Sequence, residues 1–582
     1  MIHQTGFASA IGWVDFSSEH RDKVKSVIDL LSTPGVIDEL GIGVIRDSFS
    51  DSLFPGVSTI QTRAKYFHAK NERRHPIPQL VFSQKKTDAG ESANNMSNFA
   101  LLYPSQTLAD LFDPDAALLQ RRSLKEIRDE IAAKLDQMIE DAELHRFGST
   151  TGEPDRWYWA APLLLDRRTP SINKDLKEWL KGVGETDDSW FFGSKKDDNQ
   201  QKDESSSKEK HFEELSLCFD NPSEAGLGPL PTDLSQVLAD MAIASPAITA
   251  LRSVSRHFED EHYFRTLFAF DIANEFLSLF NKPESIAAVR MSTDRAVYWR
   301  RVLEYCVNGG LQSVLDEFFH VLRADCPTIR DLFHRLVDSM NLGTASIKVD
   351  DLKSFLNGKR RNMRCHYAVD LGNQRVETDD GKNRIKGIRH NFNSPFRPFV
   401  LATTSIGQEG LDFHTYCRKI VHWNLPTNPI DLEQREGRIN RFKGLVIRQQ
   451  IAAKYGTLLS DEWLKNDDVW NALFKIADEH ERKGTGKCEL IPFWHVEADL
   501  FQIERIIPFY PFSRDRAKLS TLLKTLALYR LAFGQPRQAE LVEHLLTNVT
   551  ESRITAIRDK LMIDLSPINY LIEPYAPVAS SL

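Results

Sequence analysis

Three side chains close to residue 440 have types and spacing that suit chemistry on a phosphate. Gln434, Arg438 and Arg441 fall at positions i, i+4 and i+7, so they share one face if the segment is helical. Two guanidinium groups at the open edge of an α/β sheet suit phosphoryl transfer with a partner domain. Gly437 beside them lacks a side chain and lets another surface approach closely. The alternative is a solvated helix on which these charges form surface ion pairs.

Two predicted β–α units must position this face. Residues 399–403 and 419–423 are short apolar runs, the first ended by a glycine-containing turn and the second by prolines. Asn428 suits the N-cap of the next helix, Pro429 its first position, and Asp431 the reciprocal place in a capping box. We therefore expect the arginines on a helix that follows a strand.

Two motifs in this region resemble those of a known superfamily. GQEGLDF (407–413) resembles motif V, and QREGRINR (434–441) matches the motif VI pattern QxxGRxxR, of superfamily 2 helicases and translocases. The wider run looks most like the Snf2-type ATPases of the bacterial RapA kind. The resemblance implies an α/β fold class: one RecA-like, parallel-sheet helicase C-terminal lobe with extensive flanking helical regions.

The resemblance also implies roles for the helix residues. Arg438 and Arg441 would be arginine fingers that reach the γ-phosphate of ATP, with Gln434 and Gly437 shaping that surface. The cofactor would be ATP with Mg²⁺, provided that a partner lobe supplies the phosphate-binding P-loop. A second chain that carries this Walker A/B lobe is therefore an expected partner.

For motif V the resemblance implies contacts with both nucleotide and nucleic acid. Gly410 and Asp412 would face the ribose of the nucleotide. Thr403, Thr404 and Ser405 would contact the backbone of a nucleic acid, DNA in our prediction, through hydroxyl and amide groups. Backbone contacts carry no base information, so no sequence specificity is expected.

The other half of such a catalytic site is missing from the sequence. No G-x-x-x-x-G-K-[ST] pattern occurs, and the nearest candidate, residues 484–488, lacks the upstream glycine and ends in cysteine. Residues 316–320 (DEFFH) superficially look like an acidic helicase box, but they sit in an apolar stripe at helical spacing. We therefore predict a turn and a helix at these places, no metal-ligating residues, and no unaided ATP hydrolysis.

The rest of the chain divides by composition. The first 67 residues resemble the start of the DUF6361 family, an uncharacterised bacterial family found near defence genes, and no activity follows from that likeness. The predicted parts are an N-terminal segment (1–67), a linker (68–97), a mostly helical inter-lobe region (98–345) with a disordered loop (194–210), the helicase lobe (346–465) and a helical accessory region (466–582).

Local patterns predict several elements within these parts. Ser123 with Glu126 predicts a capping box. The apolar, aromatic run 157–165 predicts buried packing rather than base stacking. Residues 364–371 predict a strand and 519–531 a helix.

Composition narrows the class of protein further. A length of 582 residues predicts several domains, and the net charge of −8 gives no global basic footprint for nucleic acid. Two local basic runs, 359–364 and 384–390, are candidates, with solvated loops as the alternative. The six scattered cysteines form no CxxC pair, which argues against a zinc site or disulfide framework and for a reducing cytoplasm. We expect a soluble cytoplasmic protein without a signal peptide or membrane span.

Three readings of function remain open. The chain is a subunit of a nucleic-acid-dependent ATPase or translocase, in bacterial defence or another DNA transaction, whose P-loop lobe lies on another chain. Alternatively it is a non-enzymatic remnant, in which a defence-gene start is fused to the second half of a helicase. A third reading is a scaffold module that binds nucleic acid or protein.

Overall fold

The computed structural model contains two compact units. The first comprises Met1–Leu342 with Pro395–Arg397, and the second comprises Gly343–Ser394 with Pro398–Leu582. The structure describes residues 80, 95–185, 210–259, 262–281, 285, 289, 297–340, 345–349, 361–365, 389–396, 400–403, 412–465, 467–482, 489–496, 501–508, 514–532, 537–550 and 553. The predictions for residues 1–67, for the loop at 194–209 and for the turn at 484–488 fall outside them.

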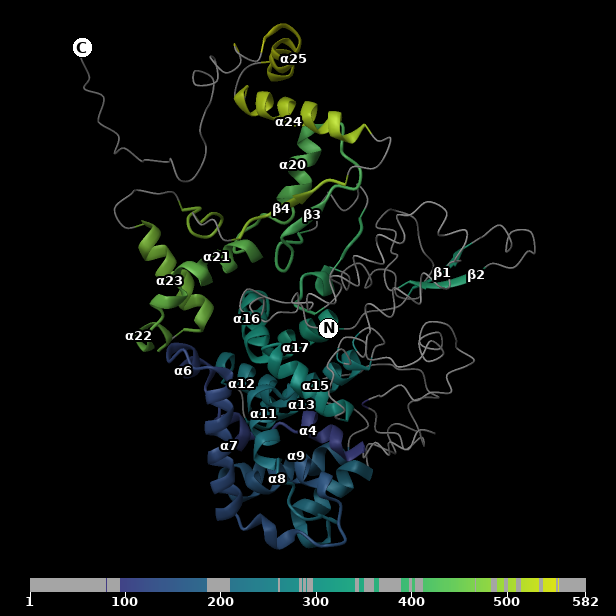
Figure 1. Cartoon of the computed structure of the whole chain (residues 1–582), viewed down its shortest axis with the longest axis vertical. Helices are drawn as coiled ribbons and strands as arrows, with labels where there is room; N and C mark the ends of the chain where they lie inside the picture. The colour runs from purple at the N-terminus through teal and green to yellow at the C-terminus, as the bar shows by residue number, and fades with distance from the viewer. Residues whose placement is uncertain are drawn as a thin grey trace. The chain divides into compact units, whose positions relative to one another are not determined.

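The first unit is built from helices packed around an aromatic core (Figure 1). Its α-helices are α4 (Phe99–Leu102), α5 (Gln106–Asp110), α6 (Pro114–Leu119), α7 (Leu124–Asp141), α8 (Trp157–Arg168), α9 (Pro170–Glu185), α11 (Leu234–Ala244), α12 (Pro246–His257), α13 (His262–Phe280), α15 (Tyr298–Asn308), α16 (Leu311–Arg323) and α17 (Ile329–Met340). Short 3₁₀ turns are η2 (Asn95–Asn98), η3 (Leu144–Phe147), η4 (Pro154–Arg156) and η5 (Pro222–Glu224). Helix α12 packs against α13 and α16, and α11 packs against α7 and α15.

The local patterns read from the sequence explain this unit well. Ser123 and Glu126 form the predicted capping box at the start of α7. The run 157–165 forms most of α8 and is buried throughout, which confirms packing. Residues 316–320 lie within α16, whose apolar stripe from Leu311 to Leu322 is buried, so they are helical as predicted. Burial of such stripes is the main source of helix stability in a folded protein.

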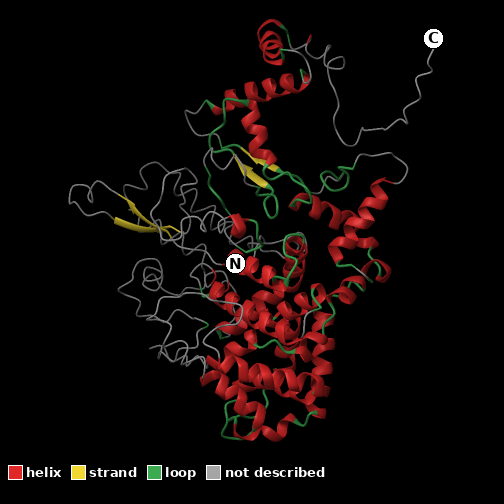
Figure 2. Cartoon of the chain, turned by 180° about the vertical axis from the view of Figure 1, so that it is seen from behind, coloured by secondary structure: helices red, strands yellow, loops and turns green. Residues whose placement is uncertain are grey.

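In its described residues the second unit combines helices with two small sheets (Figure 2). Strand β1 (Ala345–Val349) pairs antiparallel with β2 (Arg361–Cys365), and β3 (Lys419–Val421) pairs parallel with β4 (Glu504–Ile506). The helices are α20 (Pro429–Gly437), α21 (Leu445–Tyr455), α22 (Asp461–Leu464), α23 (Val469–Arg482), α24 (Asp515–Leu531) and α25 (Gln538–Asn548), with a 3₁₀ turn, η7 (Gly456–Leu458). Helix α24 contains the predicted helix 519–531.

The strands correct several sequence predictions. Residues 400–403 are described and are not a strand, and the predicted strand 419–423 ends at Val421, where Trp423 N donates to Val421 O and begins a turn. Strand β2 starts before Arg364 and ends at Cys365, where the described residues stop. The partner of β3 comes from 504–506, in a segment predicted to be helical. Within the described ranges, therefore, helix predominates and the parallel sheet is a pair of strands.

Among the described helices, none alone is long and apolar enough to cross a bilayer. The bent pair of α11 and α12 passes the same test together, on length and composition only. Both helices are largely buried within the first unit, as expected for core helices of a folded domain.

Candidate functional site

The site begins where helix α20 ends. Asn428 caps the helix as predicted, with its Oδ1 accepting from Ile430 N at 3.0 Å, and Pro429 is the first residue. Within the described hydrogen bonds, Asp431 makes no reciprocal capping bond. The helix ends at Gly437, so Arg438 is its C-cap and Arg441 lies beyond it. The prediction that Gln434, Arg438 and Arg441 share one helical face is therefore wrong.

Local and long-range hydrogen bonds together explain the early end of the helix. The amides of Arg438 and Ile439 donate to the carbonyl oxygens three residues before them, which tightens the last turn. Arg438 O then accepts from the amide of Phe413 at 2.9 Å, a residue from the motif V segment. The chain leaves the helix because this long-range bond replaces a helical one.

One further bond holds the motif V segment beside the chain that follows motif VI, and another anchors it to the segment at Asn393. The amide of Leu445 donates to His414 O at 2.9 Å, and Asn393 Nδ2 donates to Asp412 O at 2.7 Å. Phe413 is buried, with its ring 5.5 Å from that of Phe392 in an edge-on contact. The backbone around Asp412 is therefore fixed before any ligand binds.

A buried arginine connects the two segments from behind. The side chain of Arg448, on α21, donates through Nη1 to Lys443 O at 2.9 Å and through Nη2 to Thr415 O at 2.6 Å. Its guanidinium also lies over the ring of Tyr416, 5.3 Å from the centroid. Arg448 thus ties the chain after Arg441 to the chain after Asp412.

A second polar cluster anchors α20 to the parallel strands. Glu436 accepts from His422 Nε2 at 3.2 Å and from Arg505 through Nε at 2.5 Å and Nη2 at 2.7 Å. Burial alone would raise the pKa of Glu436, but the hydrogen bonds and positive charges of these partners lower it to about 2. His422 follows β3 and Arg505 lies in β4, so this carboxylate joins three elements.

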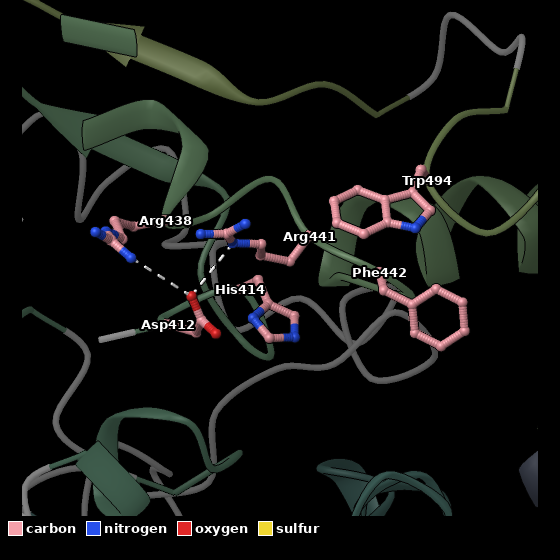
Figure 3. A pocket seen from close by; sticks show the side chains of 6 residues that line it. All are labelled: Asp412, His414, Arg438, Arg441, Phe442 and Trp494. Carbon is pink, nitrogen blue, oxygen red and sulfur yellow. Dashed lines mark ion pairs between the residues drawn. The ribbon is translucent and has the colours of Figure 1, made fainter. Parts of the chain in front are cut away.

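These elements form an open pocket of about 440 Å³, drawn in Figure 3. Its lining residues are Asp412, His414, Arg438, Arg441, Phe442 and Trp494. Asp412 Oδ1 lies 3.2 Å from Arg441 Nε and 3.9 Å from Arg438 Nη1. Among these lining residues two guanidinium groups face one carboxylate, so their summed charge is positive, which suits an anion.

The histidine in the pocket is held neutral. Burial lowers the pKa of His414, and the charges of Arg448, Arg441 and Arg389 lower it further, while Asp412 opposes them. Its Nδ1 is buried without a hydrogen-bond partner in the described part of the chain. A neutral imidazole adds a hydrogen-bonding group to the pocket without adding charge.

The structure brings together only some of the predicted site residues. Asp412, Arg438 and Arg441 line the same pocket, whereas the exposed Gln434 lies outside it. A side chain at Gly437 would meet no described atom within 4 Å, so no described part of this chain makes the predicted close approach. Thr403 is exposed and does not line the pocket. Thr404, Ser405 and Gly410 lie outside the described residues.

Three lining residues were not predicted. His414 and Phe442 directly follow motifs V and VI, and an aromatic residue next to an arginine is a usable signal. Trp494 comes from a distant segment and no local pattern indicates it. Among the described residues, no group of three His, Cys, Asp or Glu side chains is placed to hold a metal ion. Because two guanidinium groups and two aromatic rings line the pocket, it is suited to an anion that also has an apolar part.

Comparison with known families covers two segments of the chain. Residues 8–71 match a family of unknown function, DUF6361, and residues 349–443 match the helicase conserved C-terminal domain. Comparisons with curated proteins and with solved structures give no significant match. The helicase C-terminal domain is a RecA-like α/β fold. The pocket residues from Asp412 to Phe442 lie inside the helicase match, and Trp494 lies outside it. Residues 349–443 of this chain are therefore similar to the C-terminal domain of helicases.

Proposed function

We propose that the second unit is the C-terminal lobe of a Snf2-like, nucleic-acid-dependent ATPase of superfamily 2, which acts with a P-loop lobe supplied by another chain. Arg438 and Arg441 would stabilise the charge on the γ-phosphate of ATP bound with Mg²⁺ in that lobe. One observation carries this proposal: the two motif VI arginines converge with Asp412 of motif V on an open, net positive pocket.

The exposure of the two arginine side chains and their ion pairs with Asp412 support this role. The side chains of Arg441 and Asp412 are each 38% exposed, and that of Arg438 is 19% exposed. The pair of Arg441 with Asp412, in which both side chains are more than a third exposed, contributes at most about 1 kcal/mol, so an incoming phosphate can take the place of Asp412 on Arg441 at small cost. The open space beside Gly437 leaves room for the surface of a partner lobe.

Nucleic-acid contact belongs to the same proposal. Thr403, Thr404 and Ser405 would meet the backbone of DNA through hydroxyl and amide groups, without base specificity. Binding of this kind releases counterions, so the affinity must fall as the salt concentration rises. Affinity for a short DNA duplex that stays constant from low to physiological salt would exclude a backbone-tracking surface.

The direct test is reconstitution of the motor. The chain alone with DNA and Mg-ATP should show no turnover, whereas addition of the product of a neighbouring reading frame that carries GxxxxGK[ST] and an acidic Walker B motif should give DNA-stimulated hydrolysis. Arg438→Ala or Arg441→Ala should then lower kcat by about 10³-fold or more. Arg435→Ala is the matched control, since its guanidinium instead donates to Asn424 O on the exposed surface.

Each outcome separates the readings. Turnover by the chain alone would refute the split site. Reconstituted turnover that survives both arginine substitutions would refute the finger role. The pairing of both arginines with Asp412 also favours a second candidate, a non-enzymatic scaffold in which these pairs are only structural. DNA binding that is unaffected by nucleotide and by every candidate partner would support that scaffold.

A further inference from the structure

An aromatic wall faces the arginines across the same pocket. The side chains of Phe442 and Trp494 line it and remain 48% and 37% exposed. Their ring centroids lie 6.4 Å apart at an angle of 57°, so the two rings are tilted and do not stack on each other. Figure 3 shows Arg441 between these rings and Asp412. Large aromatic surface at the edge of a charged pocket is a common feature of nucleotide and nucleic-acid sites.

The wall is held from behind by a packed cluster. The Phe493 ring lies 5.6 Å from that of Phe442 and 5.9 Å from that of the buried Phe474. Lys443 places its ammonium 4.4 Å from the Phe474 centroid, and its backbone amide donates to Phe493 O at 2.8 Å. These contacts position the rings without a ligand, which reduces the entropy lost on binding.

The pocket therefore presents three chemistries in one place. Guanidinium groups bind phosphate, a carboxylate accepts hydrogen bonds from sugar hydroxyls, and an open aromatic face stacks on a planar base. These are the three parts of a nucleoside phosphate. Phosphate alone would leave the exposed wall unused, and an apolar ligand would leave the arginines unused.

We propose that this pocket binds both the base and the phosphate of a nucleoside phosphate. The base stacks on Trp494 and its edge contacts Phe442, while the phosphate binds Arg438 and Arg441. This inference rests on the proposed function for its phosphate end and adds the residues that recognise the base. The ligand is either a free nucleotide such as ATP or a nucleotide of a single strand. Stacking tolerates every base, so selectivity between ATP and GTP is expected to be weak.

Calorimetric titration of the full chain at low salt tests the base end separately from the phosphate end. The probes are ATP, inorganic tripolyphosphate and a ten-residue oligothymidylate. Trp494→Ala should weaken ATP binding roughly 5- to 150-fold, the range expected for loss of one stacked base, and leave tripolyphosphate binding unchanged. Arg441→Ala should weaken the binding of both ATP and tripolyphosphate. Trp494→Phe should recover most of the ATP affinity.

The matched control is Trp423→Ala, which removes a tryptophan that is 65% exposed and lies outside the pocket; it should leave every titration unchanged. If Trp494→Ala weakens only the oligothymidylate, the base is supplied by a strand. ATP binding that depends on Arg441 and not on Trp494, with the oligothymidylate unaffected, overturns the base site and leaves the proposed function standing. No effect of either substitution on any probe overturns the nucleoside-phosphate site, whereas the proposed function fails if reconstituted turnover survives Arg438→Ala and Arg441→Ala.

Discussion

The buried charges of the first unit and the pocket charges of the second unit are used in opposite ways. In the first unit, Asp166 is buried and accepts from Tyr103 Oη, Ser105 Oγ and Thr107 N. Burial raises the pKa of Asp166, although these hydrogen bonds oppose the change. In the pocket of the second unit, Arg441 is more than a third exposed and meets a carboxylate at 3.2 Å.

The same contrast holds for the arginines. Arg252 in α12 is buried and donates to Ala109 O, Ala242 O and Gln312 Oε1 at 2.5–3.1 Å. A buried charge whose hydrogen bonds are all made inside the protein serves stability, since breaking any of them leaves a buried group unpaired. A half-exposed charge in a loose ion pair contributes little to stability and can exchange its partner for a ligand. The molecule therefore separates structural arginines from those available for binding.

The largest test of this comparison is removal of Arg252. Burial lowers its pKa to about 9, so it remains charged at neutral pH. Arg252→Met leaves three acceptors without their donor, and we expect the first unit to lose about 3–5 kcal/mol of unfolding free energy. Hydrogen exchange in α12 under increasing denaturant measures that loss. Arg256→Met on the same helix, which removes partly exposed ion pairs, should cost less than about 1 kcal/mol. Equal effects would refute the distinction.

Arg448 sharpens the comparison, because it is a structural arginine inside the second unit. Arg448→Met removes both donors that join Lys443 O to Thr415 O. We expect a loss of about 2–4 kcal/mol, from one buried and one partly buried carbonyl that lose their donors, together with weaker tripolyphosphate binding in calorimetry because the pocket walls separate. Arg448→Lys should not rescue binding, since an ammonium lacks the planar fork. Unchanged exchange rates in α21 would show that Arg448 does not connect the walls.

Glu436 gives a pH-dependent version of the test. Because its folded-state pKa of about 2 lies below the unfolded value near 4.3, its carboxylate stabilises the fold above that value. This stability is lost as the pH falls from about 4.3 towards 2. Glu436→Gln should cost about 2 kcal/mol at pH 7, and the difference from the native chain should shrink at pH 3, as measured by denaturant unfolding. Glu433→Gln, at a more exposed position, should show almost no difference at either pH.

The smallest expected effect on stability belongs to the pocket itself. Arg441→Ala should change the unfolding free energy of the second unit by less than about 1 kcal/mol, because its ion pair joins two side chains that are each 38% exposed. The same substitution should weaken tripolyphosphate binding in calorimetric titrations. A destabilisation as large as that of Arg448→Met would place Arg441 among the structural arginines.

The sequence predicted most where the physics is local. The capping box at Ser123 and the buried stripe of α16 depend on neighbours three or four residues away, and both are confirmed. The prediction that α20 continues to Arg441 was wrong, because the amide of Phe413, from another segment, donates to Arg438 O in place of a helical bond. Trp494 was not predicted because it too comes from a distant segment. Motif likeness indicated Asp412 and both arginines, whereas only the tertiary structure brings Trp494 to the pocket.

The parallel pairing of β3 with β4 has a consequence for synthesis. Strand β3 leaves the ribosome long before its partner, and at about 5–20 residues per second the wait is on the order of ten seconds. During that time the backbone groups of β3 and the carboxylate of Glu436 lack Arg505 and the rest of β4. A fragment that ends with the helicase match at residue 443 keeps that unpaired strand permanently and lacks Trp494 as well. The motif-bearing segment therefore reaches its final form only after later parts of the chain have been made.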